Sequence, residues 1–235
     1  MRVYDYRTDI CNVFVSAECR SRFMTLAPGK QAALHSHDLG HEIFLVLQGV
    51  ATFLIAGETG TVAPGQLVVA RRDEVHSVAN HGSEVMTMYL SVTPHIHPTH
   101  TGREENGDRK PYSFPGNATY DDQAGADLAI GALIDRHLAA GEALQAVVAS
   151  CTKVQREQVA ALRAATAGAP AAPTEVSAAP SLPAPPTPPA AADLESARLA
   201  MWDALYPVFK QSADLAAAWN ALAPRITEQN AALPR

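Results

Sequence analysis

The chain has 235 residues, 47% of them hydrophobic, and a formal net charge of −6. The length suits one domain of ordinary size or two small ones. The negative charge argues against a general nucleic-acid binder, which would present a basic face. The N-terminus shows no apolar core of signal-peptide length, and no apolar run reaches the roughly 18 residues of a transmembrane helix. Three cysteines without a C-x-x-C motif are typical of reduced thiols, so we expect a cytoplasmic protein that binds no membrane.

Short apolar runs separated by Gly and Pro turns fill residues 11–92. The main runs are 22–26, 43–47, 51–56, 67–70 and 85–92. Several short strands at close spacing predict an all-β sandwich or barrel. Glu42 opens the second run, and the two-residue period of a strand predicts that its carboxylate shares a face with Phe44, Val46 and Gln48. Phe44 then either lines a pocket or belongs to the core.

Two histidines precede this strand on a segment that reads as extended. His35 and His37 are two residues apart, so their side chains are expected on one face. With Gly29, Glu42 and Gly49 they form the string G-x5-H-x-H-x4-E-x6-G. A hairpin between the two segments would bring the carboxylate beside both imidazoles. Two neutral imidazoles and one carboxylate are a donor set for a divalent first-row metal.

A further histidine, His76, follows the predicted strand at residues 67–70. His76 and Asn80 are spaced as in the second motif of the cupin superfamily, and the string around His35 matches the first cupin motif at every spaced position. The second match is partial, because Arg71 and Asp73 stand where the family usually has Pro and Gly. The chain thus resembles a small, single-domain cupin of the quercetin-dioxygenase-like type. The resemblance covers less than half of the chain.

The resemblance implies an all-β cupin barrel, also described as a double-stranded β-helix or jelly roll, followed here by an α-helical C-terminal region. It implies a divalent metal held by His35, His37, Glu42 and His76. Fe(II) is favoured, while Mn, Ni or Zn also suit imidazole and carboxylate ligands. The activity implied most often is that of a dioxygenase or other oxidoreductase acting on a small oxygenated or aromatic molecule.

Other functions fit the same ligands. The metal could polarise a carbonyl in an isomerase or lyase. A non-catalytic ligand-binding or sensor module, with helices that mediate interactions, is the alternative to an enzyme. In an enzyme, His41 could act as a base or support a metal ligand, although strand alternation points it away from Glu42. Tyr89 could donate a hydrogen bond to the substrate, or simply pack in the core. We expect a small-molecule substrate and a homodimer.

Residues 93–117 are polar and rich in proline, which predicts a loop. His95, His97 and His100 form a second cluster there. They could bind another metal or close over the mouth of the barrel. Because no carboxylate accompanies them at a fixed spacing, we expect a solvated loop instead.

The hydrophobic period then changes to three and four residues, as amphipathic helices require. We predict a barrel with its C-terminal loop at 1–117, a helical segment at 118–166, a Pro/Ala-rich linker at 167–192 and a second helical segment at 193–235. The linker region holds eight of the seventeen prolines. Asp121 and Asp122 are candidate N-caps. Gly141 is expected to weaken or divide the first helix, and Pro207 to break or kink the second.

Overall fold

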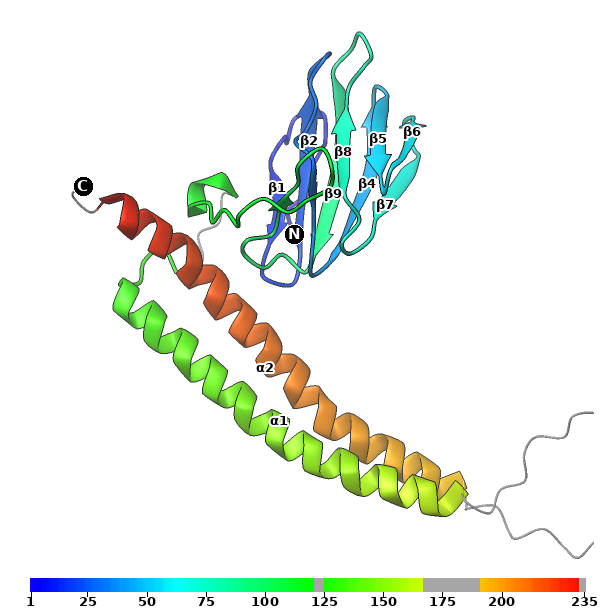
Figure 1. The fold of residues 1–235 in the computed structure, drawn as a ribbon, viewed down its shortest axis with the longest axis vertical. Helices are drawn as coiled ribbons and strands as arrows, with labels where there is room; N and C mark the ends of the chain where they lie inside the picture. The colour runs from blue at the N-terminus through cyan, green and yellow to red at the C-terminus, as the bar shows by residue number, and fades with distance from the viewer. Residues whose placement is uncertain (121–124, 167–190, 233–235) are drawn as a thin grey trace, which may run out of the picture. The chain divides into compact units, whose positions relative to one another are not determined.

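A computed structural model describes residues 1–120, 125–166 and 191–232 of the chain. Along these residues, short strands are followed by two long helices (Figure 1). The strands are β1 (Asn12–Val15), β2 (Arg20–Leu26), β3 (His35–Ser36), β4 (His41–Gln48), β5 (Ala51–Ile55), β6 (Glu58–Val62), β7 (Leu67–Ala70), β8 (His76–Ala79), β9 (Met86–Thr93) and β10 (Thr101–Gly102). The helices are the 3-10 turn η1 (Asn117–Thr119), α1 (Ile130–Thr166) and α2 (Ala191–Ala232).

The strands form two antiparallel five-stranded sheets, in the orders β1-β2-β9-β4-β7 and β10-β3-β8-β5-β6. Alternate residues of each strand enter the core between them, as in β4, where Phe44 and Val46 are buried. The facing sheet contributes Phe53 and Val78 to the same cluster. The predicted all-β barrel followed by a helical region is confirmed.

The predicted hairpin between the histidine segment and the glutamate strand is wrong. β3 pairs with β8 and β10, whereas β4 pairs with β7 and β9. The two segments therefore lie in different sheets, and the chain crosses from one sheet to the other between His37 and His41. The carboxylate of Glu42 reaches the imidazoles across the interior of the barrel.

The inward face of β4 ends earlier than alternation predicts. Phe44 and Val46 lie inside with Glu42, but Gln48 is exposed. The pairing with β9 shifts register between Val46 and Gln48, and such an irregularity turns the following side chain to the other face. Phe44 is both a core residue and part of a cavity wall.

Both helices are more regular than their sequences suggest. α1 runs unbroken through Gly141, and α2 runs unbroken through Pro207, so the predicted breaks are wrong. Intrinsic propensity is a weak guide that packing between helices can override. The candidate caps Asp121 and Asp122 lie outside the described residues, as does nearly all of the predicted linker. None of the helices in the described residues is long and apolar enough to cross a membrane.

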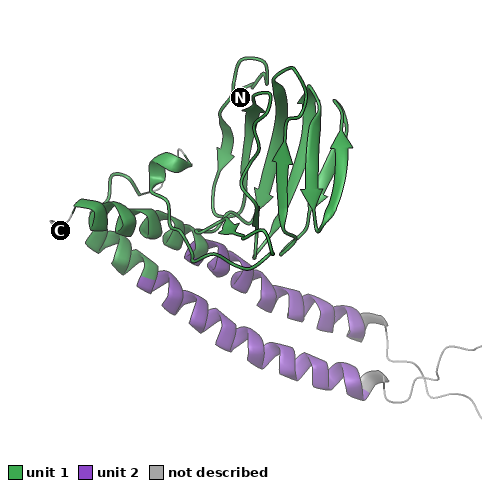
Figure 2. Ribbon diagram, turned by 45° about the horizontal axis from the view of Figure 1, so that its top comes forward, with its two compact units in different colours: residues 1–137, 216–235 green, residues 138–215 purple. Residues whose placement is uncertain are grey.

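The contacts divide the chain into two compact units (Figure 2). Unit 1 comprises Met1–His137 and Ala216–Arg235, and unit 2 comprises Leu138–Leu215. In unit 2, the Gln155 side chain donates a hydrogen bond to the carbonyl of Met201, 2.8 Å away. In unit 1, the first turn of α1 packs its buried Leu133 on the last turns of α2.

Candidate metal centre

Four side chains from the two sheets meet in the interior of the barrel. His35 lies on β3 directly opposite His76 on β8, and His37 follows β3 immediately. Glu42 comes from β4 in the facing sheet. One potential ligand atom from each residue lies within 4.8 Å of the others. The structure therefore brings together the four residues that the sequence predicts as metal ligands.

Each imidazole has one ring nitrogen committed to the backbone. The Nδ1 atoms of His35, His37 and His76 lie 2.9, 2.6 and 2.8 Å from the carbonyl oxygens of Ala33, Thr99 and Glu74. A carbonyl only accepts, so each Nδ1 carries the proton. In a neutral ring, Nε2 is then an unprotonated lone pair. This tautomer is the one in which histidine binds metals through Nε2, with the other nitrogen held by a hydrogen bond.

The three Nε2 atoms converge on one carboxylate oxygen. Glu42 Oε2 lies 2.8 Å from His37, 3.1 Å from His76 and 3.7 Å from His35. Burial raises the pKa of the Glu42 carboxyl, but hydrogen bonds from His35, His37 and His76 outweigh burial and hold this pKa well below its usual range. Such a bond needs a proton on Nε2, in the position that a metal cation would otherwise take. The carboxylate is therefore ionised inside the barrel.

This donor set fits a divalent metal. Three neutral imidazoles and one carboxylate present only acceptors to one another, and acceptors in contact repel unless a proton or a cation lies between them. The Nε2 of His35 is buried without a hydrogen-bond partner. Such a mixture of nitrogen and oxygen ligands suits Fe, Mn, Ni or Zn, and does not select one of them.

Neighbouring residues fix the loop that carries the ligands. Arg103 donates hydrogen bonds to the Ser36 hydroxyl at 2.8 and 3.0 Å and pairs with Asp38 at 3.3 Å. Gly40 leaves room for the chain to cross between sheets, because a Cβ there would collide with the carbonyl of Thr93. The five-residue step from His37 to Glu42 thus depends on glycine for steric reasons.

A cavity of about 290 Å³ adjoins the four ligands. Its apolar wall includes Phe44, Met88 and Leu90. Its polar wall includes Arg20, Arg22, His100 and Tyr120. The sequence analysis singled out His100, as part of a second histidine cluster, but not Arg20, Arg22 or Tyr120. For the arginines a signal existed, since both occupy inward positions of a strand that also carries Met24 and Leu26.

His100 and Tyr120 form a hydrogen-bonded pair beside the metal ligands. His100 Nδ1 lies 2.8 Å from the Tyr120 hydroxyl, and its ring centroid lies 4.8 Å from that of His35. Burial, followed by the charges of His35 and His37, holds the pKa of His100 well below its ordinary value. Burial raises the pKa of Tyr120. Both groups are therefore neutral near pH 7.

The predicted solvated loop around the second histidine cluster is wrong. His95 and His97 are 0% and 3% exposed. Their backbone is held by α2: Asn220 bonds His97 N at 3.0 Å and the carbonyl of His95 at 2.6 Å. Trp219 donates to the carbonyl of His97 at 2.6 Å. Local sequence could not show this, because the partners lie more than a hundred residues away.

The two predicted catalytic residues lie away from these ligands. His41 is exposed, and its Nδ1 accepts a hydrogen bond from the backbone of Arg72. Tyr89 points to the opposite face of β9 from Met88 and Leu90, and its ring lies 5.9 Å from that of Phe23. Neither lines the cavity beside the metal ligands.

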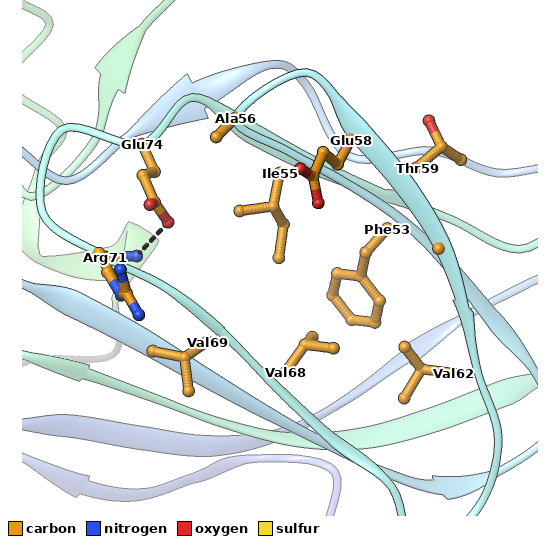
Figure 3. Close-up of a pocket in the computed structure, with 11 residues that line it drawn as sticks. Phe53, Ile55, Ala56, Glu58, Thr59, Val62, Val68, Val69, Arg71 and Glu74 are labelled. Atoms are coloured by element: carbon orange, nitrogen blue, oxygen red, sulfur yellow. Dashed lines mark hydrogen bonds between the residues drawn. The ribbon is translucent and has the colours of Figure 1, made fainter.

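A larger cavity, of about 450 Å³, is lined by β5, β6 and β7 (Figure 3). Its charged residues are Glu58, Arg71 and Glu74, and the backbone N–H of Arg71 donates to Glu74 (Figure 3). Its described lining contains no histidine or cysteine. The candidate site is therefore identified by its four convergent potential ligands and not by the size of its cavity.

Several solved structures are similar to the barrel. A conserved protein with a double-stranded beta-helix domain from Klebsiella pneumoniae has 19% identity and a TM-score of 0.41, over 45% of this chain and 99% of that one. A cupin superfamily protein from Desulfitobacterium hafniense has 17% identity and a TM-score of 0.32, over 35% and 72%. A cupin domain from Schizosaccharomyces pombe has 15% identity and a TM-score of 0.35, over 36% and 62%.

A comparison with curated proteins finds no match to the chain. The family model described as Cupin domain matches residues 22–93. This range contains β4, β8 and β9 and all four candidate ligands. Residues 22–93 of this chain therefore form a cupin domain.

Proposed function

We propose that this protein is a metal-dependent oxidoreductase of the dioxygenase type, acting on a small oxygenated molecule inside the barrel. The observation that carries the proposal is the convergence of three Nε2 lone pairs and one ionised carboxylate beside a cavity. A structural metal would need no adjoining cavity of about 290 Å³.

His35, His37, Glu42 and His76 would hold the metal, and Fe(II) is the metal we favour. Bound there, Fe(II) would supply redox chemistry with O2, whereas Zn(II) would supply only Lewis acidity. The backbone carbonyls that hold each Nδ1 keep the ligands oriented before the metal arrives.

The remaining cavity residues have separate roles. The side chains of Phe44, Met88 and Leu90 exclude water from the reacting molecule. Tyr120 and His100 are neutral and hydrogen-bonded to each other. The phenol can therefore give a proton to the substrate, or take one from it while the imidazole of His100 accepts the phenol's own proton.

Two measurements test the proposal. Protein purified without added metal should contain divalent metal in an amount approaching one ion per chain. The Fe(II)-loaded protein should consume O2 with a member of a panel of catechols, flavonols, diketones, thiols and hydroxy acids. Uptake should vanish in Glu42→Ala and persist in His41→Ala, which changes an exposed histidine one position away. Metal retained in full by Glu42→Ala, without loss of affinity, would contradict the assignment of ligands.

A second candidate is an isomerase or lyase that uses the metal as a Lewis acid. The His100–Tyr120 pair favours it, because such reactions need a positioned proton donor and acceptor. Turnover of a panel compound without O2 uptake, and its loss in Tyr120→Phe, would support this reaction class over the dioxygenase. Tight binding with no chemical change under any metal would contradict both and favour a sensor.

A further inference from the structure

Two arginines project into the candidate cavity from a strand that otherwise carries core residues. Arg20 and Arg22 alternate with Met24 on the inward face of β2. Arg20 is 4% exposed. Arginine is almost never so deeply buried unless it is paired with an acid or serves a function.

The strand register places the arginines in rows with the metal site. Arg20 lies opposite Val92 on β9, and Val92 lies opposite Glu42 on β4. Arg22 shares the next row with Leu90 and Phe44 in the same way. Strands in a sheet are about 4.8 Å apart, so the backbones of Arg20 and Glu42 are roughly 10 Å apart on one inner face. A molecule of a few atoms can bridge a guanidinium and the metal ligands.

Arg20 is only partly satisfied by protein groups. Its Nε donates to the Asn12 side chain at 3.1 Å, and its guanidinium lies 4.7 Å from the centre of the Tyr120 ring. These contacts orient the side chain without neutralising its charge. Burial, and then the positive charge of Arg22, lower the pKa of Arg20 to about 10, which still leaves it cationic at pH 7.

Arg22 has less support still. Its Nε is buried and has no hydrogen-bond partner. Among the described residues, no carboxylate lies within ion-pair distance of Arg22 or of Arg20. Burying an unpaired charge costs several kcal/mol, and an anion supplied from solution would offset this penalty.

We propose that the cavity binds a small organic carboxylate, with its anionic group held by Arg22 and Arg20 and its other oxygen atoms facing His35, His37, Glu42 and His76. The inference deepens the proposed function and rests on it for the role of the four ligands. The planar fork of a guanidinium matches a carboxylate with two parallel hydrogen bonds.

The cavity is large enough for a small carboxylic acid. A volume of about 290 Å³ corresponds to about ten water molecules. A carboxylic acid of about ten non-hydrogen atoms therefore fits it.

The test is a calorimetric titration of the full chain loaded with Zn(II), which carries no redox chemistry. The probes are salicylate and 2-oxoglutarate, with salicylamide as a neutral compound of the same shape and atom count as salicylate. Salicylate should bind at least about tenfold more tightly than salicylamide, since hydrogen bonds to charged groups are worth more than neutral ones. Arg22→Gln should lower the affinity for the carboxylates about 10- to 100-fold and leave that for salicylamide unchanged. Arg72→Gln, which removes the same charge from an exposed position, should change neither.

A second variant separates ligand binding from a structural role. Arg22→Met keeps an apolar stem of similar length and removes the charge of this half-buried side chain. Without ligand its unfolding temperature should equal or exceed that of the wild type, because replacing a half-buried charge that has no acidic partner by apolar volume is neutral or stabilising. A clear drop in unfolding temperature, with unchanged carboxylate affinity, would show that Arg22 is structural and would overturn the proposal.

Other outcomes are equally decisive. Equal affinity for salicylate and salicylamide, tighter binding of phenyl phosphate than of either carboxylate, or no carboxylate binding at millimolar concentration would overturn the proposed ligand class. If the chain binds no metal, the proposed function fails, yet the Arg22-dependent preference for carboxylates remains measurable in chelator-treated protein. If metal binds and Arg22→Gln has no effect, only the present inference fails.

Discussion

Two H-x-H pairs in this barrel have the same spacing and different surroundings. His35 and His37 aim their Nε2 atoms at the buried carboxylate of Glu42. His95 and His97 are also buried, but their rings lie beside Tyr120. The first pair is arranged around a charge, whereas the second lies in a segment secured through its backbone by α2.

The difference indicates that a carboxylate, rather than histidine spacing, marks the candidate metal site. Beside Glu42, three imidazoles face an ionised group that a cation can share. Away from a carboxylate, burial and the neighbouring His97 lower the pKa of His95 to about 3, so this ring stays neutral and has a packing role. In this chain, the H-x-H motif therefore indicates a pair of metal ligands only where the fold places a carboxylate beside the two rings.

The largest expected effect is on metal affinity. The double variant His35→Ala, His37→Ala should weaken Zn(II) or Fe(II) binding by more than about a thousandfold, equivalent to about 4 kcal/mol, since it removes two of four ligands. Circular dichroism should show a folded barrel. The matched variant His95→Gln, His97→Gln should keep its metal. If both double variants bind metal equally, or if the second loses metal while folded, the distinction between the pairs fails.

The second effect concerns what holds the His95 segment. Asn220→Ala should lower the free energy of unfolding by about 3 kcal/mol, because it leaves a buried N–H and a buried carbonyl without their partners. Asn230→Ala changes an exposed asparagine on the same helix and should change stability by less than about 0.5 kcal/mol. Chemical denaturation of both variants gives the comparison. Equal stabilities would mean that α2 does not support this segment.

The third effect is a dependence of stability on pH. The folded pKa of His95, about 3, lies below its unfolded value of 6.5, so the unfolded chain takes up the proton first as pH falls. The stabilising contribution is complete above about pH 6.5 and is lost progressively down to about pH 3. Between about pH 7 and pH 5 the loss should approach 2 kcal/mol. His95→Gln should flatten the stability profile over this range, and an unchanged slope would contradict a neutral buried His95.

The smallest effect sharpens the contrast with an exposed histidine. His41→Ala should change metal affinity and stability by less than about 0.5 kcal/mol, because its ring is exposed and bonds only to the backbone of Arg72. Isothermal titration with Zn(II) measures the first quantity and thermal unfolding the second. A tenfold loss of affinity would show that His41 supports a ligand after all.

Much of the fold follows from local pattern, since each strand carries its own alternation. The four ligands also follow, because the spacing of His35, His37 and Glu42 matches a motif specific enough to predict them. The pairing of β3 with β8 instead of β4 depends on which sheet each segment joins. The local sequence does not determine the sheet to which a segment belongs. The arginines were a missed signal: two charges at inward positions of a core strand indicate a buried function, even before a structure is known.

The hydrogen bonds between α2 and the His95–His97 backbone span 122 to 125 residues of sequence. The same stretch continues to Thr99, whose carbonyl fixes the ring of His37. On a ribosome that adds about 5–20 residues per second, the barrel strands emerge on the order of ten seconds before their last partners are made. All four candidate ligands of a nascent chain are therefore synthesised before the helix residues that hold this segment. Truncation before residue 219 removes these bonds while all four candidate ligands remain in the chain.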